Sequence, residues 1–175
     1  LLEATLKRLR MFVLRSQVVL EEASDTLVAM GVAGTKVDTH LRPWFTDVPT
    51  ALDSSRTENN ITALRLSDQH APRYMLFAPP EQLVTLWTAL RPTTQAVGTA
   101  AWRMLDIRAG IPLIQSATVE AFVPQMVNYQ LIGGVSFKKG CYPGQEVVAR
   151  MQYLGKLKRR MYRARIDHND DLTTP

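Results

Sequence analysis

Two short apolar segments, residues 61–66 (ITALRL) and 73–78 (RYMLFA), follow one another with the polar stretch SDQHAP between them. Runs of this length bounded by turn residues are typical of β-strands. The next stretch, PPEQLVTLWTALRP, places Leu83, Leu86, Trp87 and Leu90 on one helical face, and Pro80 suits the first helical turn. This strand, strand, helix order predicts a domain that mixes α and β structure.

The residues before this unit predict a similar set of elements. Helical spacing of Leu2, Leu6 and Leu9 predicts a helix to about residue 10, and two β-branched runs at 16–22 and 25–32 predict a hairpin. Residues 33–42 suit a helix that ends before Pro43, whereas residues 43–60 are turn-rich and are expected to be irregular. The closest simple template is a ferredoxin-like βαββαβ unit without its first strand, so the expected fold class is α+β.

A second unit is expected after the polar linker TTQAVGTA at residues 93–100. The stretch TAAWRMLDIRAGIP predicts a helix that Gly110 and Pro112 terminate. Near the end of the chain, GKLKRRMYRARI has the character of a basic strand. From Arg150 to Arg165 the chain carries seven cations and no acid, which favours a phosphate, nucleic-acid or polyanionic partner; a solvated basic face is the alternative.

Composition limits the cellular compartment and the kinds of site that are expected for the protein. One cysteine excludes an internal disulfide framework, and three scattered histidines show no metal-ligand spacing, so we expect a reducing compartment, by default the cytoplasm or an organelle matrix, and no metal of its own. No apolar run approaches the roughly 20 residues that span a bilayer. The chain opens without methionine and is expected to be an internal part of a longer protein.

The lone cysteine lies in KKGCYPGQEVVAR, residues 138–150. Tyr142-Pro143-Gly144-Gln145 predicts a type II turn, and a helix is expected from Gln145 to Gly155, with Val147, Val148, Met151 and Leu154 at helical spacing. The helix N-terminus and Lys138 and Lys139 favour thiolate over thiol at Cys141. The alternative is a small buried cysteine that fills space.

The segment GGVSFKKGCYPGQEVVAR resembles the K-G-C-Y-x-G-Q-E signature of the YgfZ family, folate-binding proteins related to the aminomethyltransferase of the glycine cleavage system. All of the specified signature positions match. The resemblance extends to LDIRAGIP, FVPQMVN and LGKLKRRMY, and more weakly to MFVLRSQVVLE, so it covers most of the chain.

The resemblance implies a three-part architecture. Residues 1–94 would be a ferredoxin-like domain, missing its first strand, inserted in a folate-binding domain like that of the aminomethyltransferase. Residues 95–155 would be the returning half of that folate-binding domain, and residues 156–175 the start of a C-terminal β-barrel.

The resemblance also implies a function. Family members bind tetrahydrofolate or a related folate and support iron–sulfur enzymes, including one that methylthiolates transfer RNA. Cys141 and Lys139 become the candidate catalytic residues, and the rest of the signature would line the ligand opening: Gly140, Tyr142, Gly144, Gln145 and Glu146. A single cysteine cannot hold an iron–sulfur cluster, which takes about four thiolates, so a transient or partner-shared role is the most it could offer.

Three further residues are candidate folate ligands. Related aminomethyltransferases have a glutamate where this chain has Arg108, and arginine cannot accept the N–H groups of a pterin, so Arg108 would take an anionic group such as a glutamate tail. A surface charge at a helix C-terminus is the alternative. The amides of Gln125 and Asn128 could form hydrogen bonds with the edge of a heteroaromatic ring, or they could instead form hydrogen bonds with backbone groups.

Three functions therefore compete. The favoured one is a folate-binding accessory protein for iron–sulfur enzymes and for transfer RNA modification, such as methylthiolation. A tetrahydrofolate-dependent aminomethyltransferase is the second, although no catalytic base is defined in these residues. The third is a nucleic-acid-binding module that contacts RNA through residues 150–165.

Overall fold

The computed structural model describes residues 1–68 and 71–165. Contacts divide the chain into two compact units, Leu1–Arg103 and Met104–Pro175. Unit 1 holds the helices α1 (Leu2–Arg10), α2 (Val37–Leu41) and α3 (Pro80–Leu90) and four strands, and α4 (Thr99–Ala109) continues from unit 1 into unit 2. The mixed α+β class is confirmed, whereas the assignment of domains to residues 1–94, 95–155 and 156–175 stays a prediction.

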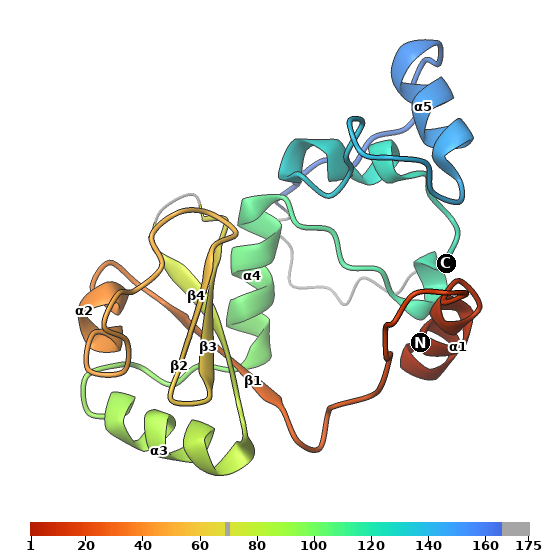
Figure 1. The fold of residues 1–175 in the computed structure, drawn as a ribbon. Coiled ribbons are helices and arrows are strands. Elements are labelled where there is room, and N and C mark those ends of the chain that lie inside the picture. Colours follow the sequence, from red (N-terminus) through yellow and green to blue (C-terminus); the bar gives the residue numbers. More distant parts are fainter. Residues whose placement is uncertain (69–70, 166–175) are drawn as a thin grey trace. The chain divides into compact units, whose positions relative to one another are not determined.

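A four-stranded antiparallel sheet forms the centre of unit 1 (Figure 1). Its strands are β1 (Val28–Ala33), β2 (Ser55–Glu58), β3 (Ile61–Leu66) and β4 (Arg73–Ala78), in the order β1-β4-β3-β2. β3, β4, α1 and α3 lie where the sequence predicts them, whereas α2 covers only residues 37–41 of the helix expected over 33–42, because Ala33 still belongs to β1. Pro80 occupies the first turn of α3, as expected.

One face of this sheet carries the core. Because successive side chains of a strand point to opposite faces, alternate residues of β3 and β4 are buried against α2 and α3. The buried apolar cluster is formed by Met30, Val37, Leu41, Phe45, Val48, Ile61, Ala63, Tyr74, Leu76, Ala78, Leu86 and Leu90. Burying each large aliphatic side chain contributes about 1.5–3 kcal/mol, so this face dominates the stability of unit 1.

Tyr74 connects three segments at the edge of that core. Its hydroxyl is 2.8 Å from Asp38 Oδ1 of α2 and 2.9 Å from the Pro49 carbonyl oxygen, and it donates toward both acceptors. Burial, reinforced by the Asp38 carboxylate, raises the pKa of Tyr74 from its ordinary 10.0 to about 12. The neutral phenol is therefore the form that the fold requires.

Trp102 of α4 covers the other face of the sheet. A Cβ on Gly31 would lie 2.4 Å from the indole ring, so only glycine fits at this point of β1. The guanidinium of Arg73 lies 5.3 Å from the centroid of the same indole, and its Nε donates to the Ser67 carbonyl at 2.6 Å. These contacts give polar and aromatic partners to an arginine side chain that is only 1% exposed.

Two sequence expectations in unit 1 are wrong. Residues 16–22 form no strand, and Val18 and Val19 remain 53% and 83% exposed. The guanidinium of Arg10 donates to the Leu20 carbonyl at 2.8 and 3.1 Å, which occupies an acceptor that a strand ladder would use. The hairpin expected from residues 16–32 therefore retains only its second strand, β1.

The other error concerns residues 43–60, which contain the strand β2. Asn59 and Asn60 both have positive φ (50° and 61°), and this pair joins β2 to β3 in a two-residue hairpin turn. β2 is a polar edge strand, so it lacks the apolar alternation that marks a strand in a sequence.

Unit 2 has little regular structure beyond helices. α4 ends as predicted, because Gly110 has φ 73° and the Ile111 N–H donates back to the Asp106 carbonyl at 2.9 Å. Three short 3₁₀ helices follow, η1 (Ser116–Thr118), η2 (Pro124–Val127) and η3 (Tyr129–Ile132), and then α5 (Gln145–Tyr153). The basic strand expected near residues 155–166 is absent over 155–165, and residue 166 lies outside the described residues.

Candidate functional site

The predicted turn ahead of α5 is confirmed. The Gln145 N–H donates to the Tyr142 carbonyl at 3.1 Å, and Gly144 has φ 85° and ψ 0°. These are the dihedral angles of the third position of a type II turn, with Pro143 at the second. Gly144 is also the residue that caps the N-terminus of α5.

Cys141 is exposed and immediately precedes this turn. The alternative of a buried, space-filling cysteine is therefore wrong for the described chain. The ammonium of Lys139 lies 4.7 Å from the centroid of the Tyr142 ring. This cation–π contact joins two signature residues on either side of the cysteine.

α5 has a single buried apolar side chain, Val148. Val148 is buried, whereas Val147 and Leu154, which the sequence places on the same apolar face, are 54% and 84% exposed. The helix ends at Tyr153, two residues before the expected Gly155. Gln145 is half-buried and Glu146 is exposed in the first helical turn.

Gln125 and Asn128 use their amide nitrogens to hold the backbone of unit 2. Gln125 Nε2 donates to the Val148 carbonyl of α5 at 2.7 Å, and Asn128 Nδ2 donates to the Met161 carbonyl at 2.9 Å. This is the backbone role that the sequence left open. The oxygens Gln125 Oε1 and Asn128 Oδ1 are buried without a hydrogen-bond partner among the described residues, so each can still accept from a donor.

Arg108 belongs to a different set of contacts from the turn. It occupies the last turn of α4 with an exposed side chain, and its carbonyl accepts a bond from Arg163 Nη1 at 3.4 Å. A cation at this position complements the negative end of the helix dipole. The structure therefore joins Lys139 with Tyr142 and joins Gln125 with α5, while Arg108 contacts the C-terminal basic stretch.

Comparison with known proteins gives close relatives, although no family model matches the chain. The chain is 40% identical over 162 residues to the tRNA-modifying protein YgfZ of Yersinia pestis (strain Pestoides F), which is 93% of this chain and 48% of that protein. It is 41% identical over 140 residues to the protein of the same name from Sodalis glossinidius (strain morsitans), which is 80% of this chain and 42% of that protein.

This chain belongs to the YgfZ family. It spans about half the length of the curated YgfZ relatives that it matches.

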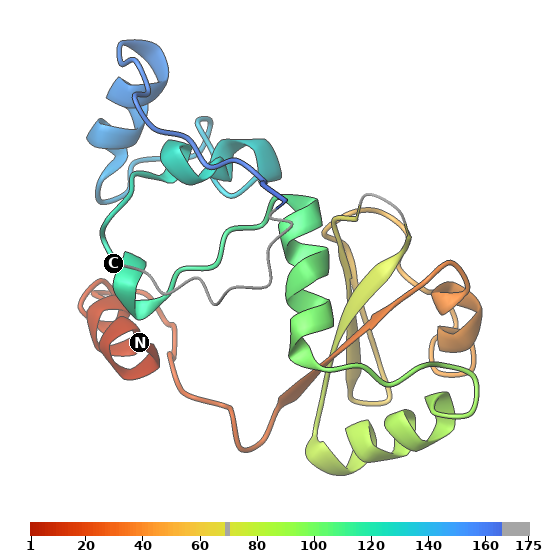
Figure 2. The ribbon, with the colours of Figure 1, turned by 180° about the vertical axis from the view of Figure 1, so that it is seen from behind.

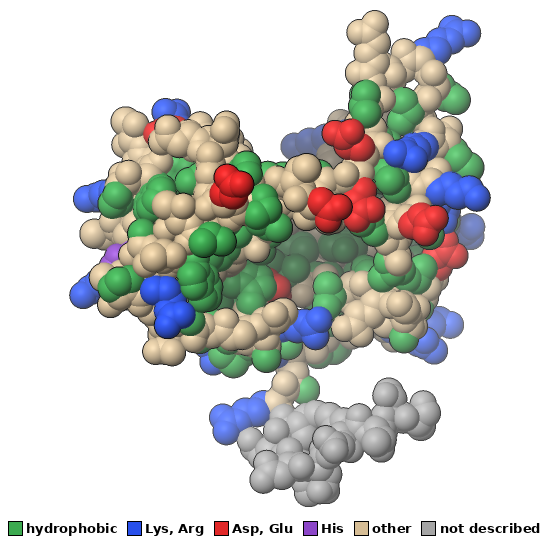
Figure 3. Space-filling view, turned by 90° about the horizontal axis from the view of Figure 1, so that it is seen from below, with side chains coloured by type: hydrophobic (Ala, Val, Ile, Leu, Met, Phe, Trp, Pro, Cys, Tyr) green, Lys and Arg blue, Asp and Glu red, His purple; other side chains and the backbone are tan. Residues whose placement is uncertain are grey.

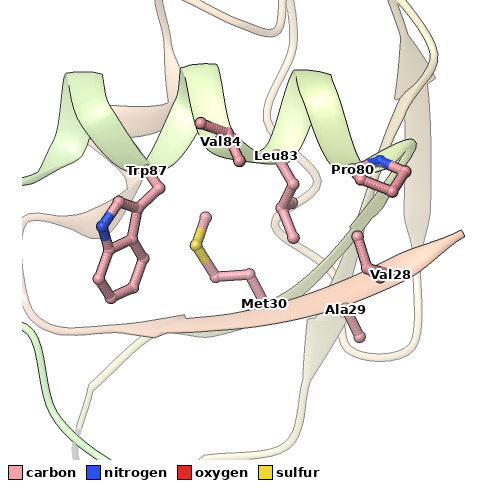
Figure 4. Close-up of a pocket in the computed structure, with 7 residues that line it drawn as sticks. All are labelled: Val28, Ala29, Met30, Pro80, Leu83, Val84 and Trp87. Carbon is pink, nitrogen blue, oxygen red and sulfur yellow. The ribbon is translucent and has the colours of Figure 1, made fainter.

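A separate concave surface lies in unit 1 of this YgfZ chain. An open groove of about 350 Å³ runs between the edge strand β1 and the helix α3 (Figure 4). Its lining is apolar: Val28, Ala29, Met30, Pro80, Leu83, Val84 and Trp87. Hydrophobic side chains are also exposed around α3 when this unit is seen from below (Figure 3). None of the residues predicted for the YgfZ site lines this groove.

The part of the chain that the structure describes offers neither a metal cluster nor a membrane span. In residues 1–68 and 71–165, no three side chains of His, Cys, Asp or Glu are grouped so that they could hold a metal ion. Within the same residues no helix is long and apolar enough to cross a membrane.

Sequence reasoning missed one anchor of the site region, Met161. Its N–H donates to the Met126 carbonyl at 2.8 Å, and its own carbonyl accepts from Asn128. Both backbone groups of one residue are thus held by η2 and its cap. A methionine in a basic stretch carries no signal for this role, because the contact is made by the backbone.

Proposed function

We propose that the complete protein is a folate-binding accessory factor for tRNA modification, with Cys141 at its working surface. The observation that carries the proposal is an exposed thiol beside a type II turn, in a chain whose relatives are named tRNA-modifying proteins. The cysteine immediately precedes the tight turn, and its exposed side chain is accessible to a partner molecule.

Cys141 acts with partners rather than as a cluster site. One thiolate cannot replace the roughly four that hold an iron–sulfur cluster. We therefore assign it a transient, single-ligand role toward an iron–sulfur enzyme, such as a methylthiotransferase that modifies tRNA. Lys139, which is held over Tyr142, supplies positive charge on the same segment.

The residues of unit 2 fit a folate in their donor and acceptor chemistry. Pterin rings present N–H donors, and the buried oxygens of Gln125 and Asn128 lack donors in the described chain. The exposed guanidinium of Arg108 suits the anionic glutamate tail of the ligand. Bound tetrahydrofolate would supply a carrier for one-carbon groups. The signature residues Tyr142, Gly144, Gln145 and Glu146 complete the proposed lining.

We propose no aminomethyl transfer. That reaction needs a group that manages protons on the carrier nitrogen, and the position that is glutamate in related aminomethyltransferases is Arg108 here. A guanidinium is donor-only and stays charged, so it cannot act as that base.

The thiol role is tested by restoring tRNA methylthiolation in cells that lack the complete protein. We expect the full-length Cys141→Ala variant to lose at least about 10-fold in restored methylthiolation, because alanine removes the thiol that is proposed to contact the iron–sulfur enzyme. Ser136→Ala, on the same exposed segment, is the matched control and should restore it fully. Full restoration by Cys141→Ala at equal protein levels would show that the thiol is dispensable.

Folate binding is tested separately by titrating the full-length protein with tetrahydrofolate while tryptophan fluorescence is recorded. We expect a saturable change that Arg108→Gln weakens, because the variant loses the charge proposed to hold the ligand tail. Arg42→Gln, an exposed arginine of unit 1, controls for the loss of one surface charge. The absence of any saturable change in the wild type would remove folate from the proposal.

A further inference from the structure

The segment from residue 156 to residue 163, here called the basic segment, leaves α5 and runs as an extended, irregular stretch (Figure 2). It contains five cations and no acid: Lys156, Lys158, Arg159, Arg160 and Arg163. A run of like charges repels itself, so it holds a fixed path only where other contacts fix its backbone. In the described part of the chain, a residue of this segment has both of its backbone groups held by hydrogen bonds.

Met161 is that fixed point. Its N–H and its carbonyl are both hydrogen-bonded, to the Met126 carbonyl at 2.8 Å and to Asn128 Nδ2 at 2.9 Å, and its side chain is half-buried. In an extended chain, neighbouring side chains point to the opposite side. Arg160 and Tyr162 therefore point to the side opposite Met161, and both are exposed.

The outward side combines cations with an exposed aromatic ring. Tyr162 is 83% exposed, far more than a phenol ring that contributes to packing. Lys158, Arg159 and Arg160, which precede it, are exposed as well. Guanidinium and ammonium groups neutralise phosphates, and exposed tyrosine rings stack on unpaired bases, so this combination is the recognition chemistry of single-stranded RNA.

We propose that the basic segment binds an unpaired region of RNA directly, with Lys158, Arg159 and Arg160 on phosphates and Tyr162 stacked on a base. This inference rests on the proposed role in tRNA modification and adds to it a physical contact with the RNA. The RNA is held by the segment that follows α5, while Cys141 precedes the same helix. The accessory factor would then bring its thiol and the RNA to the modifying enzyme together.

The test measures binding of the full-length protein to an unmodified tRNA transcript by fluorescence anisotropy over a series of salt concentrations. In the Lys158→Gln/Arg160→Gln variant, the slope of log K against log salt should become shallower by roughly 0.7 for each phosphate that the protein no longer neutralises. Lys36→Gln/Arg42→Gln removes the same charge from exposed positions of unit 1 and should leave the slope unchanged. Equal effects of the two double variants would show that RNA binding depends only on the net charge of the protein, and this would overturn the proposal.

Stacking is tested with Tyr162→Ala and Tyr162→Phe. The alanine variant should bind the tRNA transcript about 5- to 150-fold more weakly, whereas phenylalanine, which keeps the ring, should bind like the wild type. A fully paired RNA duplex of similar length should show no difference between the three proteins. Unchanged tRNA binding by Tyr162→Ala, or no binding of the wild type at low salt, would overturn the proposal.

The outcomes separate this inference from the proposed function. Cys141→Ala should bind the tRNA transcript as the wild type does, because the thiol is not part of the contact. If Cys141→Ala abolishes methylthiolation while the wild type fails to bind RNA, the RNA contact is wrong and the thiol role stands. If RNA binding follows the predictions while Cys141→Ala remains fully active, the thiol role is wrong and the RNA contact stands.

Discussion

Gly140 and Gly144 flank the exposed thiol, but the backbone requires glycine at only one of the two positions. Gly144 has φ 85°, in the left-handed region that other residues enter at a cost of roughly 1–2 kcal/mol. Gly140 lies outside that region, and a Cβ there would meet open space. The signature therefore contains one glycine that the turn demands and one that local geometry does not explain.

A substitution pair distinguishes these two glycines. Gly144→Ala should lower the free energy of unfolding of the full-length protein by about 1–2 kcal/mol, because alanine is strained at positive φ. Gly140→Ala should leave it unchanged or slightly raised. Urea denaturation of both variants provides the measurement. An equal loss in both would show that the positive φ does not set the requirement at Gly144.

At the residue scale, the sequence could predict local chemistry but not long-range partners. Pro143-Gly144 specifies its own turn, since proline and glycine restrict the backbone wherever they occur. Gln125 could be recognised only as an amide in a loop. That it reaches the Val148 carbonyl on α5 depends on how residues distant in sequence fold together, and no pattern near Gln125 contains that information.

At the scale of elements, β4 and α2 depend on one buried hydroxyl group. Tyr74 of β4 contacts Asp38 of α2 and the loop carbonyl of Pro49, and its pKa is raised to about 12 by burial and by Asp38. The raised pKa means that folding favours the neutral phenol. This stabilisation is fully present below pH 10 and is lost as the pH rises from 10 through 12.

Tyr74→Phe should therefore change both the level and the pH dependence of stability. Near pH 7 the variant should lose about 0.5–1.5 kcal/mol for the hydrogen bond removed. Between pH 10 and 12 its unfolding free energy should fall less steeply than that of the wild type, because the buried titrating group is gone. Tyr162→Phe, at an exposed ring, is the control. Parallel alkaline curves for wild type and Tyr74→Phe would contradict this account.

Elements with apolar periodicity were predictable, and polar elements were not. β3, β4 and α3 bury one face each, and that face is visible as spacing in the sequence. β2 is a polar edge strand, yet the Asn59-Asn60 pair before ITALRL was a hairpin signal that could have revealed it. Residues 16–22 show the opposite error, because their β-branched residues find no neighbouring strand in the structure.

At the scale of the whole molecule, the two units differ in the number of side chains that they bury. Unit 1 has a continuous buried cluster around its sheet. In the described part of unit 2, the buried side chains are Gln125, Val127 and Val148. The signature motif was recognisable because it is local, whereas the ligand lining that it implies needs residues from several segments and stays a proposal.

The contact between Gly31 and Trp102 makes the residue that evolution can accept at position 31 depend on a position distant in sequence. The indole occupies the space that any larger residue at position 31 would fill. A side chain can therefore appear there only in a lineage that has already exchanged the tryptophan for something smaller. Position 31 thus stays glycine for as long as the indole stays in place.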